Sequence, residues 1–171
     1  MKPVVIDSSA AAPWLIPEER TPVSEQLYAD VLSSPGQFHA PALWLWETSN
    51  ILLVSLRRRR VEQEQFDAGL SLLDACGIEF DAPPNAHRRS QIMRLALVHE
   101  LTFYDASYLE LALRLNGQLA SADRQLVNAA KRCGITCYDL WHATRQDPYP
   151  RLRPPGHAAD RPARARGPWV L

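Results

Sequence analysis

The sequence predicts an α/β protein built around a parallel sheet. Short β-branched or apolar runs recur along the chain, and helical segments of about ten or more residues separate them. Connections of that length join parallel strands through right-handed crossovers. The 171 residues, of which 46% are hydrophobic, suffice for one domain with a buried core.

Each element follows from its local pattern. The β-branched run VVI before Asp7 predicts the first strand, and the alanine-rich segment SSAAAPWLI favours a helix. TPVSEQLYADVLSS repeats apolar residues at the helical period, which predicts a second helix. Further strand-like runs are FHAP, IEF, QLAS and ITCYDL, and further helices are predicted at residues 42–60, 62–76, 86–98, 102–116 and 123–132. Thr102 and Asp105 have the spacing of a capping box at one of these helix starts.

Composition divides the chain near residue 145. Residues 145–171 contain six arginines, two aspartates and six of the fourteen prolines, which predicts a flexible tail. Residues 1–144 are predicted to form the domain, with thirteen basic and seventeen acidic side chains. An acidic body is a poor match for nucleic acid unless cations or clustered arginines intervene.

Several classes of function lack their motifs. The seven glycines form neither G-x-G-x-x-G nor G-x-x-x-x-G-K-[ST], which disfavours nucleotide binding by a Rossmann or P-loop site. G-x-S-x-G and H-E-x-x-H are absent from the sequence. Cys76, Cys133 and Cys137 contain no C-x-x-C pair, so we expect buried free thiols. A membrane span and a signal peptide are not expected, and the location expected is the cytoplasm.

Acidic residues stand at positions where a site can form. Asp7 ends the first predicted strand, and Asp123 ends the strand QLAS. Ligands of open parallel sheets bind beyond the carboxyl ends of the strands. Glu47 lies one turn into the helix after FHAP, where Asn50 shares its face, and Asp105 lies in the first turn of the helix before QLAS. The four acids are therefore predicted to converge on one edge of the sheet.

Helix capping is the simpler explanation for each aspartate taken singly. Glu47 is different, because it interrupts the apolar stretch WLWETSNILLV, where an unpaired carboxylate is costly to bury. Carboxylates brought together repel, and the chain has only two lysines. A hard divalent cation is the more natural counter-charge, and oxygen ligands suit Mg²⁺ or Mn²⁺.

Residues 3–140 contain four stretches that form a joint pattern: VVIDSSAAAPWL, ALWLWETSNIL, LTFYDASYLELALRLNGQLASADRQLVNAA and ITCYDL. In combination they resemble a PIN-domain ribonuclease, and within that family the VapC-type toxin of a toxin–antitoxin pair. The resemblance implies a three-layer α/β/α fold with a central parallel sheet of four or five strands, in a PIN domain of residues 1–144.

The resemblance also implies an activity and a site. The implied reaction is hydrolysis of RNA phosphodiester bonds by a metal-activated water, with Mg²⁺ as cofactor and Mn²⁺ as a substitute. The implied metal-binding and catalytic residues are Asp7, Glu47, Asp105 and Asp123, supported by Ser9, Asn50 and Ser121. The implied partners are RNA, a cognate VapB-like antitoxin and a second copy of the chain.

Other functions fit the sequence less well. A catalytically silent PIN fold serving as a binding module is the main alternative, and the intact set of acids argues against it. A response-regulator receiver needs a lysine near the end of the last strand, where ITCYDL has none. A haloacid-dehalogenase-like phosphatase begins with D-x-D, where this chain has DSS.

Two further groups of residues keep two interpretations each. The arginines at 57–60 form either a solvated helix end or contacts to RNA phosphates. Trp14, Trp44 and Trp46 belong either to the core or to an apolar groove for the antitoxin.

Overall fold

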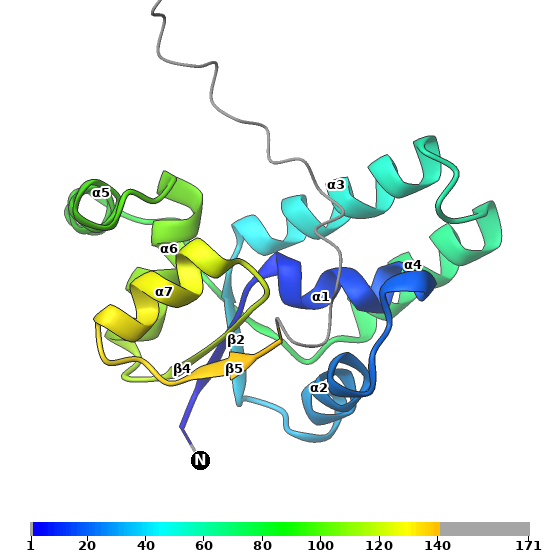
Figure 1. Ribbon diagram of the computed structural model, residues 1–171, viewed down its shortest axis with the longest axis horizontal. Coiled ribbons are helices and arrows are strands. Elements are labelled where there is room, and N and C mark those ends of the chain that lie inside the picture. The colour runs from blue at the N-terminus through cyan, green and yellow to red at the C-terminus, as the bar shows by residue number, and fades with distance from the viewer. Residues whose placement is uncertain (1, 141–171) are drawn as a thin grey trace, which may run out of the picture.

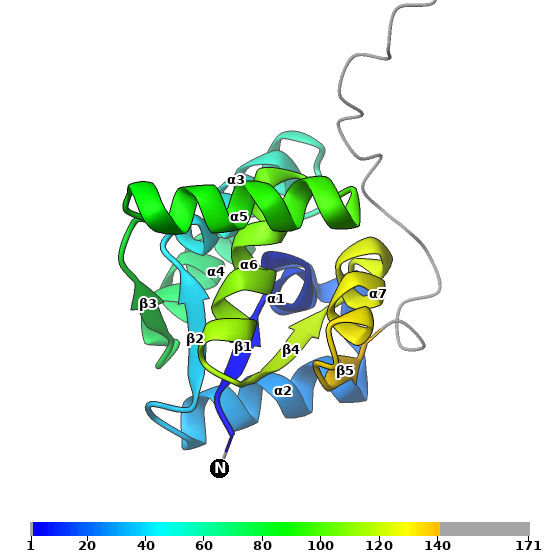
Figure 2. The ribbon, with the colours of Figure 1, turned by 90° about the vertical axis from the view of Figure 1, so that its left-hand side faces the viewer.

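The computed structural model describes residues 2–140, which form a five-stranded sheet enclosed by helices (Figure 1). The strands are β1 (Val4–Ile6), β2 (Phe38–Pro41), β3 (Glu79–Asp81), β4 (Gln118–Ser121) and β5 (Cys137–Asp139). They lie in the order β3, β2, β1, β4, β5, which Figure 2 shows with α6 in front of the sheet. All four pairings are parallel, as the long connections predict.

Helices cover both faces of the sheet. They are α1 (Ser8–Leu15), α2 (Pro22–Ser33), α3 (Leu43–Arg57), α4 (Gln63–Ala75), α5 (Ala86–His99), α6 (Phe103–Arg114) and α7 (Arg124–Arg132), with a 3-10 turn η1 (Pro17–Glu19). Figure 1 shows α1 to α4 on one side and α5 to α7 on the other. The chain runs outward from β1 to β3 and then returns to β4 and β5 on the other side of β1. Right-handed crossovers therefore place the later helices on the opposite face, which confirms the three-layer fold.

The inner strands are buried on both faces. All three residues of β1 are fully buried, which is why this strand is a continuous apolar run rather than an alternating one. The largest fully buried side chains are Trp44 of α3 and Tyr108 of α6, which come from the two opposite helical layers. Both therefore belong to the core.

Gly117 allows β4 to begin close against β1. A Cβ atom at this position would lie 2.7 Å from the carbonyl oxygen of Pro3, closer than real Cβ atoms approach. The next residue, Gln118, donates its backbone N–H to the same oxygen at 2.8 Å. The parallel pairing of the two strands thus depends on a residue without a side chain.

Helix α6 begins at the predicted cap, but the predicted capping box is wrong. The Thr102 hydroxyl oxygen accepts the backbone N–H of Asp105 at 3.0 Å, as an N-cap does. The same hydroxyl donates to the Asp105 carboxylate at 2.8 Å, whereas a box requires that carboxylate to bond the backbone N–H of Thr102. Asp105 is therefore oriented by a side chain.

Other predictions have mixed outcomes. The three cysteines are free, as expected, but each is half-buried rather than buried. No helix within residues 2–140 is both long and apolar enough to cross a bilayer. The predicted tail at 145–171 and the last residues of the predicted domain lie outside the described part of the chain, so that boundary stays a prediction.

Candidate active site

Two of the predicted acids follow the adjacent strands β1 and β4. The winding of the sheet reverses between these strands, which is where open parallel sheets bind their ligands. Asp7 directly follows β1, and its backbone N–H donates to the carbonyl of Ala120 in β4 at 2.9 Å. Asp123 lies two residues beyond Ser121, the last residue of β4. The sheet itself therefore brings these two segments together, from positions 116 residues apart in the sequence.

Two serines hold the Asp7 carboxylate. The hydroxyls of Ser9 and Ser121 both donate to its Oδ2 atom, the latter at 2.8 Å. Ser9 Oγ also accepts the backbone N–H of Ala122 at 2.9 Å, and Ser121 Oγ accepts that of Asp123 at 2.9 Å. No hydrogen bond found within residues 2–140 uses the second oxygen of Asp7, Oδ1. Asp7 is thus fixed through one oxygen.

The environment of Asp7 disfavours its charged form. Asp7 is 5% exposed, and burial raises its pKa from 3.8 to about 7, with further contributions from the negative charges of Glu47 and Asp105. The bonds from the two serines lower the pKa but do not cancel these effects. Three of the four predicted acids are therefore close enough to interact electrostatically.

Glu47, on α3, completes a cluster of three acids with Asp7 and Asp105. It is hydrogen-bonded by Tyr108, a residue that was not part of the predicted site. The hydroxyl of Tyr108 donates to its Oε2 atom, across 61 positions of sequence. Burial raises the pKa of Glu47, hydrogen bonds with Tyr108 and Ser8 lower it, and the charge of Asp105 raises it again. The sequence pattern did not predict this hydrogen bond, because Tyr108 occupies a position of α6 where an apolar core residue is expected.

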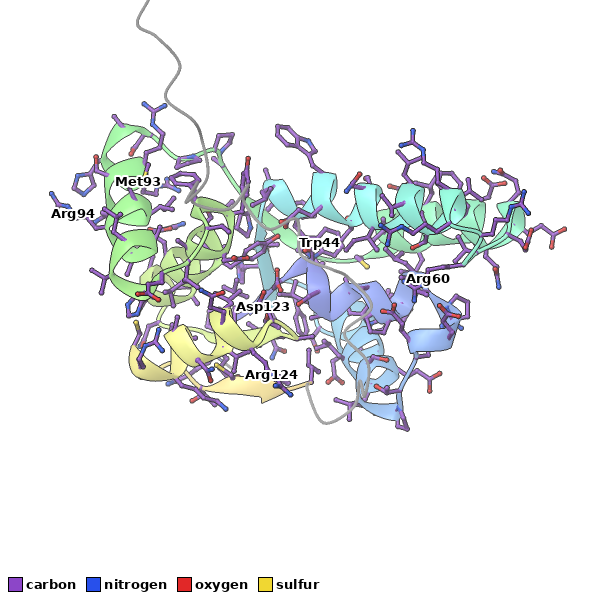
Figure 3. The ribbon with its side chains drawn as sticks, turned by 45° about the horizontal axis from the view of Figure 1, so that its top comes forward. Trp44, Arg60, Met93, Arg94, Asp123 and Arg124 are labelled. Atoms are coloured by element: carbon purple, nitrogen blue, oxygen red, sulfur yellow. The ribbon has the colours of Figure 1, made fainter. Side chains whose placement is uncertain are left out.

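The other predicted residues occupy different surroundings. Asp123 is the N-cap of α7, where its Oδ1 accepts the N–H groups of Gln125 at 2.7 Å and Leu126 at 3.1 Å. Its capping role is thus present whatever else it does. Arg124 follows Asp123 in the first turn of α7 (Figure 3). It is a source of positive charge in addition to the two lysines of the chain. Asn50 is exposed one turn beyond Glu47, and no hydrogen bond found within residues 2–140 joins it to the cluster.

The comparison with known families decides the identity of this fold. The sequence matches the family model of the PIN domain over residues 4–132. The chain belongs to the PIN-domain family. Within it, ribonuclease VapC3 of Pyrobaculum aerophilum is 32% identical over 127 residues, which are 72% of this chain and 91% of that protein. This PIN domain is therefore of the VapC type.

A solved structure supports the fold independently. The crystal structure of PAE2754 from Pyrobaculum aerophilum matches this PIN domain with a TM-score of 0.59 and 23% sequence identity. The match covers 80% of this chain and 83% of that chain. At this identity the likeness establishes the fold alone.

The carboxylates of this PIN domain suit a hard cation that brings its own water. No three His, Cys, Asp or Glu side chains within residues 2–140 are already arranged as a metal site. Mg²⁺ does not require such a cage, because it commonly binds one or two carboxylates and keeps several waters. The second oxygen of Asp7, the burial and the neighbouring negative charges that raise its pKa, and the oxygen-only donors fit such an ion.

An apolar hollow of about 210 Å³ lies beside the start of α3 and α6 of the PIN domain. Its lining includes Pro83, Trp46, Phe103 and Tyr104. Trp46 is 78% exposed, whereas Trp14 and Trp44 are buried in the core. The core interpretation is therefore confirmed for Trp14 and Trp44, while an antitoxin groove at the exposed Trp46 stays a prediction.

Proposed function

We propose that this PIN domain is an Mg²⁺-dependent endoribonuclease toxin that a cognate antitoxin neutralises. One observation carries the proposal: Asp7, Glu47 and Asp105 interact electrostatically beyond the carboxyl ends of β1 and β4, in a chain of the VapC type. A structural role alone gives no reason to hold repelling carboxylates together at a ligand-binding edge.

Each residue has a defined part in the proposed reaction. Asp7, Glu47 and Asp105 would bind the metal, with Asp123 as the fourth acid at the start of α7. Bound Mg²⁺ would supply a water of lowered pKa and stabilise charge on the phosphoryl group. Ser9 and Ser121 keep Asp7 in one rotamer, and Asn50, on the exposed face of α3, stays a predicted supporting residue.

Cleavage of RNA by the purified full chain tests the activity. Total RNA is incubated with wild type, Glu47→Gln and Glu64→Gln, in Mg²⁺ and in EDTA. The control Glu64 is an exposed glutamate of α4, so its substitution changes the charge equally without touching the cluster. We expect cleavage by wild type and by the control in Mg²⁺ only, and a loss of at least a hundredfold in Glu47→Gln.

Two results would contradict the proposal. Cleavage that continues in EDTA after removal of bound metal would exclude metal dependence. RNA that stays intact with both Mg²⁺ and Mn²⁺, although the protein binds it, would favour the catalytically silent binding module.

The apolar hollow beside α3 supports the antitoxin as a protein partner. Exposed aromatic side chains are typical of protein interfaces, and Trp46 and Tyr104 are 78% and 60% exposed. Expression of the chain alone should inhibit growth, and co-expression of the neighbouring antitoxin gene should restore it. Trp46→Ala should weaken that rescue while leaving toxicity intact; equal rescue would exclude this hollow as the binding surface.

The homodimer remains a prediction, which exposed apolar side chains on α5 support. Met93, Leu97 and Val98 of α5 are between 50% and 75% exposed, which is unusual for apolar side chains on one helix. Light scattering of the purified chain should give twice the mass of 19.3 kDa. The mass of a monomer at micromolar concentration would contradict this prediction.

A further inference from the structure

Tyr108 is a buried tyrosine whose hydroxyl reaches the acid cluster. Its side chain is fully buried in α6, among the largest in the core. A phenylalanine would fill the same space, so packing alone does not require the hydroxyl. Burying that polar group without a partner is costly, and its partners here are Oε2 of Glu47 and the side chain of Ser8.

The bond between Tyr108 and Glu47 joins the two helical layers. Glu47 is on α3, which covers one face of the sheet, and Tyr108 is on α6, which covers the other (Figure 1). Asp105 lies three residues before Tyr108 on the same helix, and its negative charge adds to burial in raising the pKa of Glu47. The carboxylates of Glu47 and Asp105 repel each other, and the hydrogen bond between Tyr108 and Glu47 opposes that repulsion by joining α6 to α3.

The bonds to the acids leave one oxygen of Asp7 available. Tyr108 and Ser8 both bond Glu47, whereas the two serines that hold Asp7 both use its Oδ2 atom. Removing a side chain that hydrogen-bonds a metal ligand and so orients it commonly lowers metal affinity by 10–100-fold.

We propose that Tyr108 is a positioning residue for the metal site, which it preorganises by holding Glu47 of α3 against Asp7 and Asp105 through its buried hydroxyl. The inference rests on the proposed metal-dependent function. Tyr108 contacts no reacting atom in this role and acts through Glu47.

Mn²⁺ binding to the full-length protein without RNA tests this role. Titration calorimetry or electron paramagnetic resonance gives the affinity of wild type, Tyr108→Phe and Tyr28→Phe. The Phe variant keeps the buried ring and removes only the hydroxyl. Tyr28 is a matched control, because it packs against Trp14 on α1, away from the acids. We expect Mn²⁺ affinity to fall 10–100-fold in Tyr108→Phe and to stay within twofold in the control.

Two further measurements separate positioning from loss of structure. In a Glu47→Ala background, Tyr108→Phe should cause no additional loss of Mn²⁺ affinity, because the side chain that Tyr108 holds is absent. Raising Mg²⁺ should restore RNA cleavage to Tyr108→Phe but not to Glu47→Gln. Ser8→Ala, which removes the second hydroxyl bonded to Glu47, should weaken Mn²⁺ binding in the same direction if Tyr108→Phe does not fold.

The outcomes distinguish the two proposals. Wild-type affinity for Mn²⁺ in folded Tyr108→Phe would overturn the positioning role and leave the metal-dependent function standing. Equal losses from Tyr108→Phe in both the wild-type and Glu47→Ala backgrounds would also overturn it, because the effect would not pass through Glu47. A wild-type protein that binds no Mn²⁺ at millimolar concentration would overturn both.

Discussion

Asp7 shows how a single side chain carries two opposing requirements. Its position after β1 is buried, and its neighbours Glu47 and Asp105 are negative, so in the metal-free protein the protonated form is favoured. Ser9 and Ser121 stabilise the ionised form, which is the form that can bind a metal. The residue is thus destabilising at neutral pH unless a cation is present.

This predicts a pH dependence for the stability of the metal-free protein. The folded-state pKa of Asp7 is raised from 3.8 to about 7, so its stabilising contribution is complete below pH 4 and is lost as pH rises to 7. Asp7→Asn removes this loss. In urea unfolding with EDTA, the variant should be more stable than wild type at pH 8 by a few kcal/mol, and nearly equal at pH 4.

Added metal provides the control for Asp7. Mg²⁺ should raise the unfolding free energy of wild type at pH 8 but have little effect on Asp7→Asn, because a ligand stabilises only the state that binds it. Parallel curves for wild type and variant from pH 4 to 8 would contradict the raised pKa.

At the scale of elements, two of the predicted site residues lie at helix starts. Helix α7 begins beside Asp123, and helix α6 begins with Thr102 bonded to Asp105. In a parallel sheet, each helix that follows a strand begins near the carboxyl edge, where ligands bind. A residue there can therefore cap a helix and also belong to a site.

The capping role of Asp123 and its proposed role in metal binding together predict a separation of stability from activity. Asp123→Asn should keep the cap, since asparagine caps helices as well as aspartate does, and change stability by less than about 1 kcal/mol. Asp123→Ala should cost about 1 kcal/mol, because the N–H groups of Gln125 and Leu126 lose their acceptor. Thermal unfolding and RNA cleavage are measured for both, with Asp74→Asn on α4 as an exposed control.

Both variants of Asp123 should lose cleavage. An Asp123→Asn protein that cuts RNA at the wild-type rate would show that this residue only caps α7. An Asp123→Ala protein that melts like wild type would instead exclude the capping contribution.

On the scale of the whole molecule, charge is unevenly arranged. Residues 1–144 carry an excess of acids, yet Arg57, Arg58 and Arg59 are exposed where α3 ends. The next residue, Arg60, bonds Glu18 at 2.7 Å and also bonds Glu19, and Figure 3 shows it near the end of the molecule where α3 passes into α4. The arginine run is therefore divided between a structural ion pair and an open positive patch.

The patch predicts a salt-dependent contribution to RNA binding. Replacing the three exposed arginines with Gln should raise KM for RNA and leave kcat unchanged. The slope of log K against log salt should fall by about 0.7 for each phosphate that the variant no longer neutralises. Arg89→Gln with Arg94→Gln on α5 provides a control of exposed arginines elsewhere. An unchanged salt slope in the triple variant would identify the patch as a solvated helix end.

Much of this protein follows from local sequence. Runs of β-branched residues, helical periods and cap residues depend on neighbours a few positions apart, so they predicted every strand and α-helix within residues 2–140 to within a few residues. The positions of Asp7 and Asp123 after their strands followed from the same patterns. Parallel pairing also followed, because the connections are too long for hairpins.

The tertiary structure alone decided how the site is held together. Ser121 bonds Asp7 across 114 positions, and Tyr108 bonds Glu47 across 61. In the sequence Tyr108 is one apolar position of a helix among many, and nothing local shows that its hydroxyl reaches another layer. Such contacts depend on how the helices pack over the sheet, and packing is set by the whole chain rather than by any window of residues.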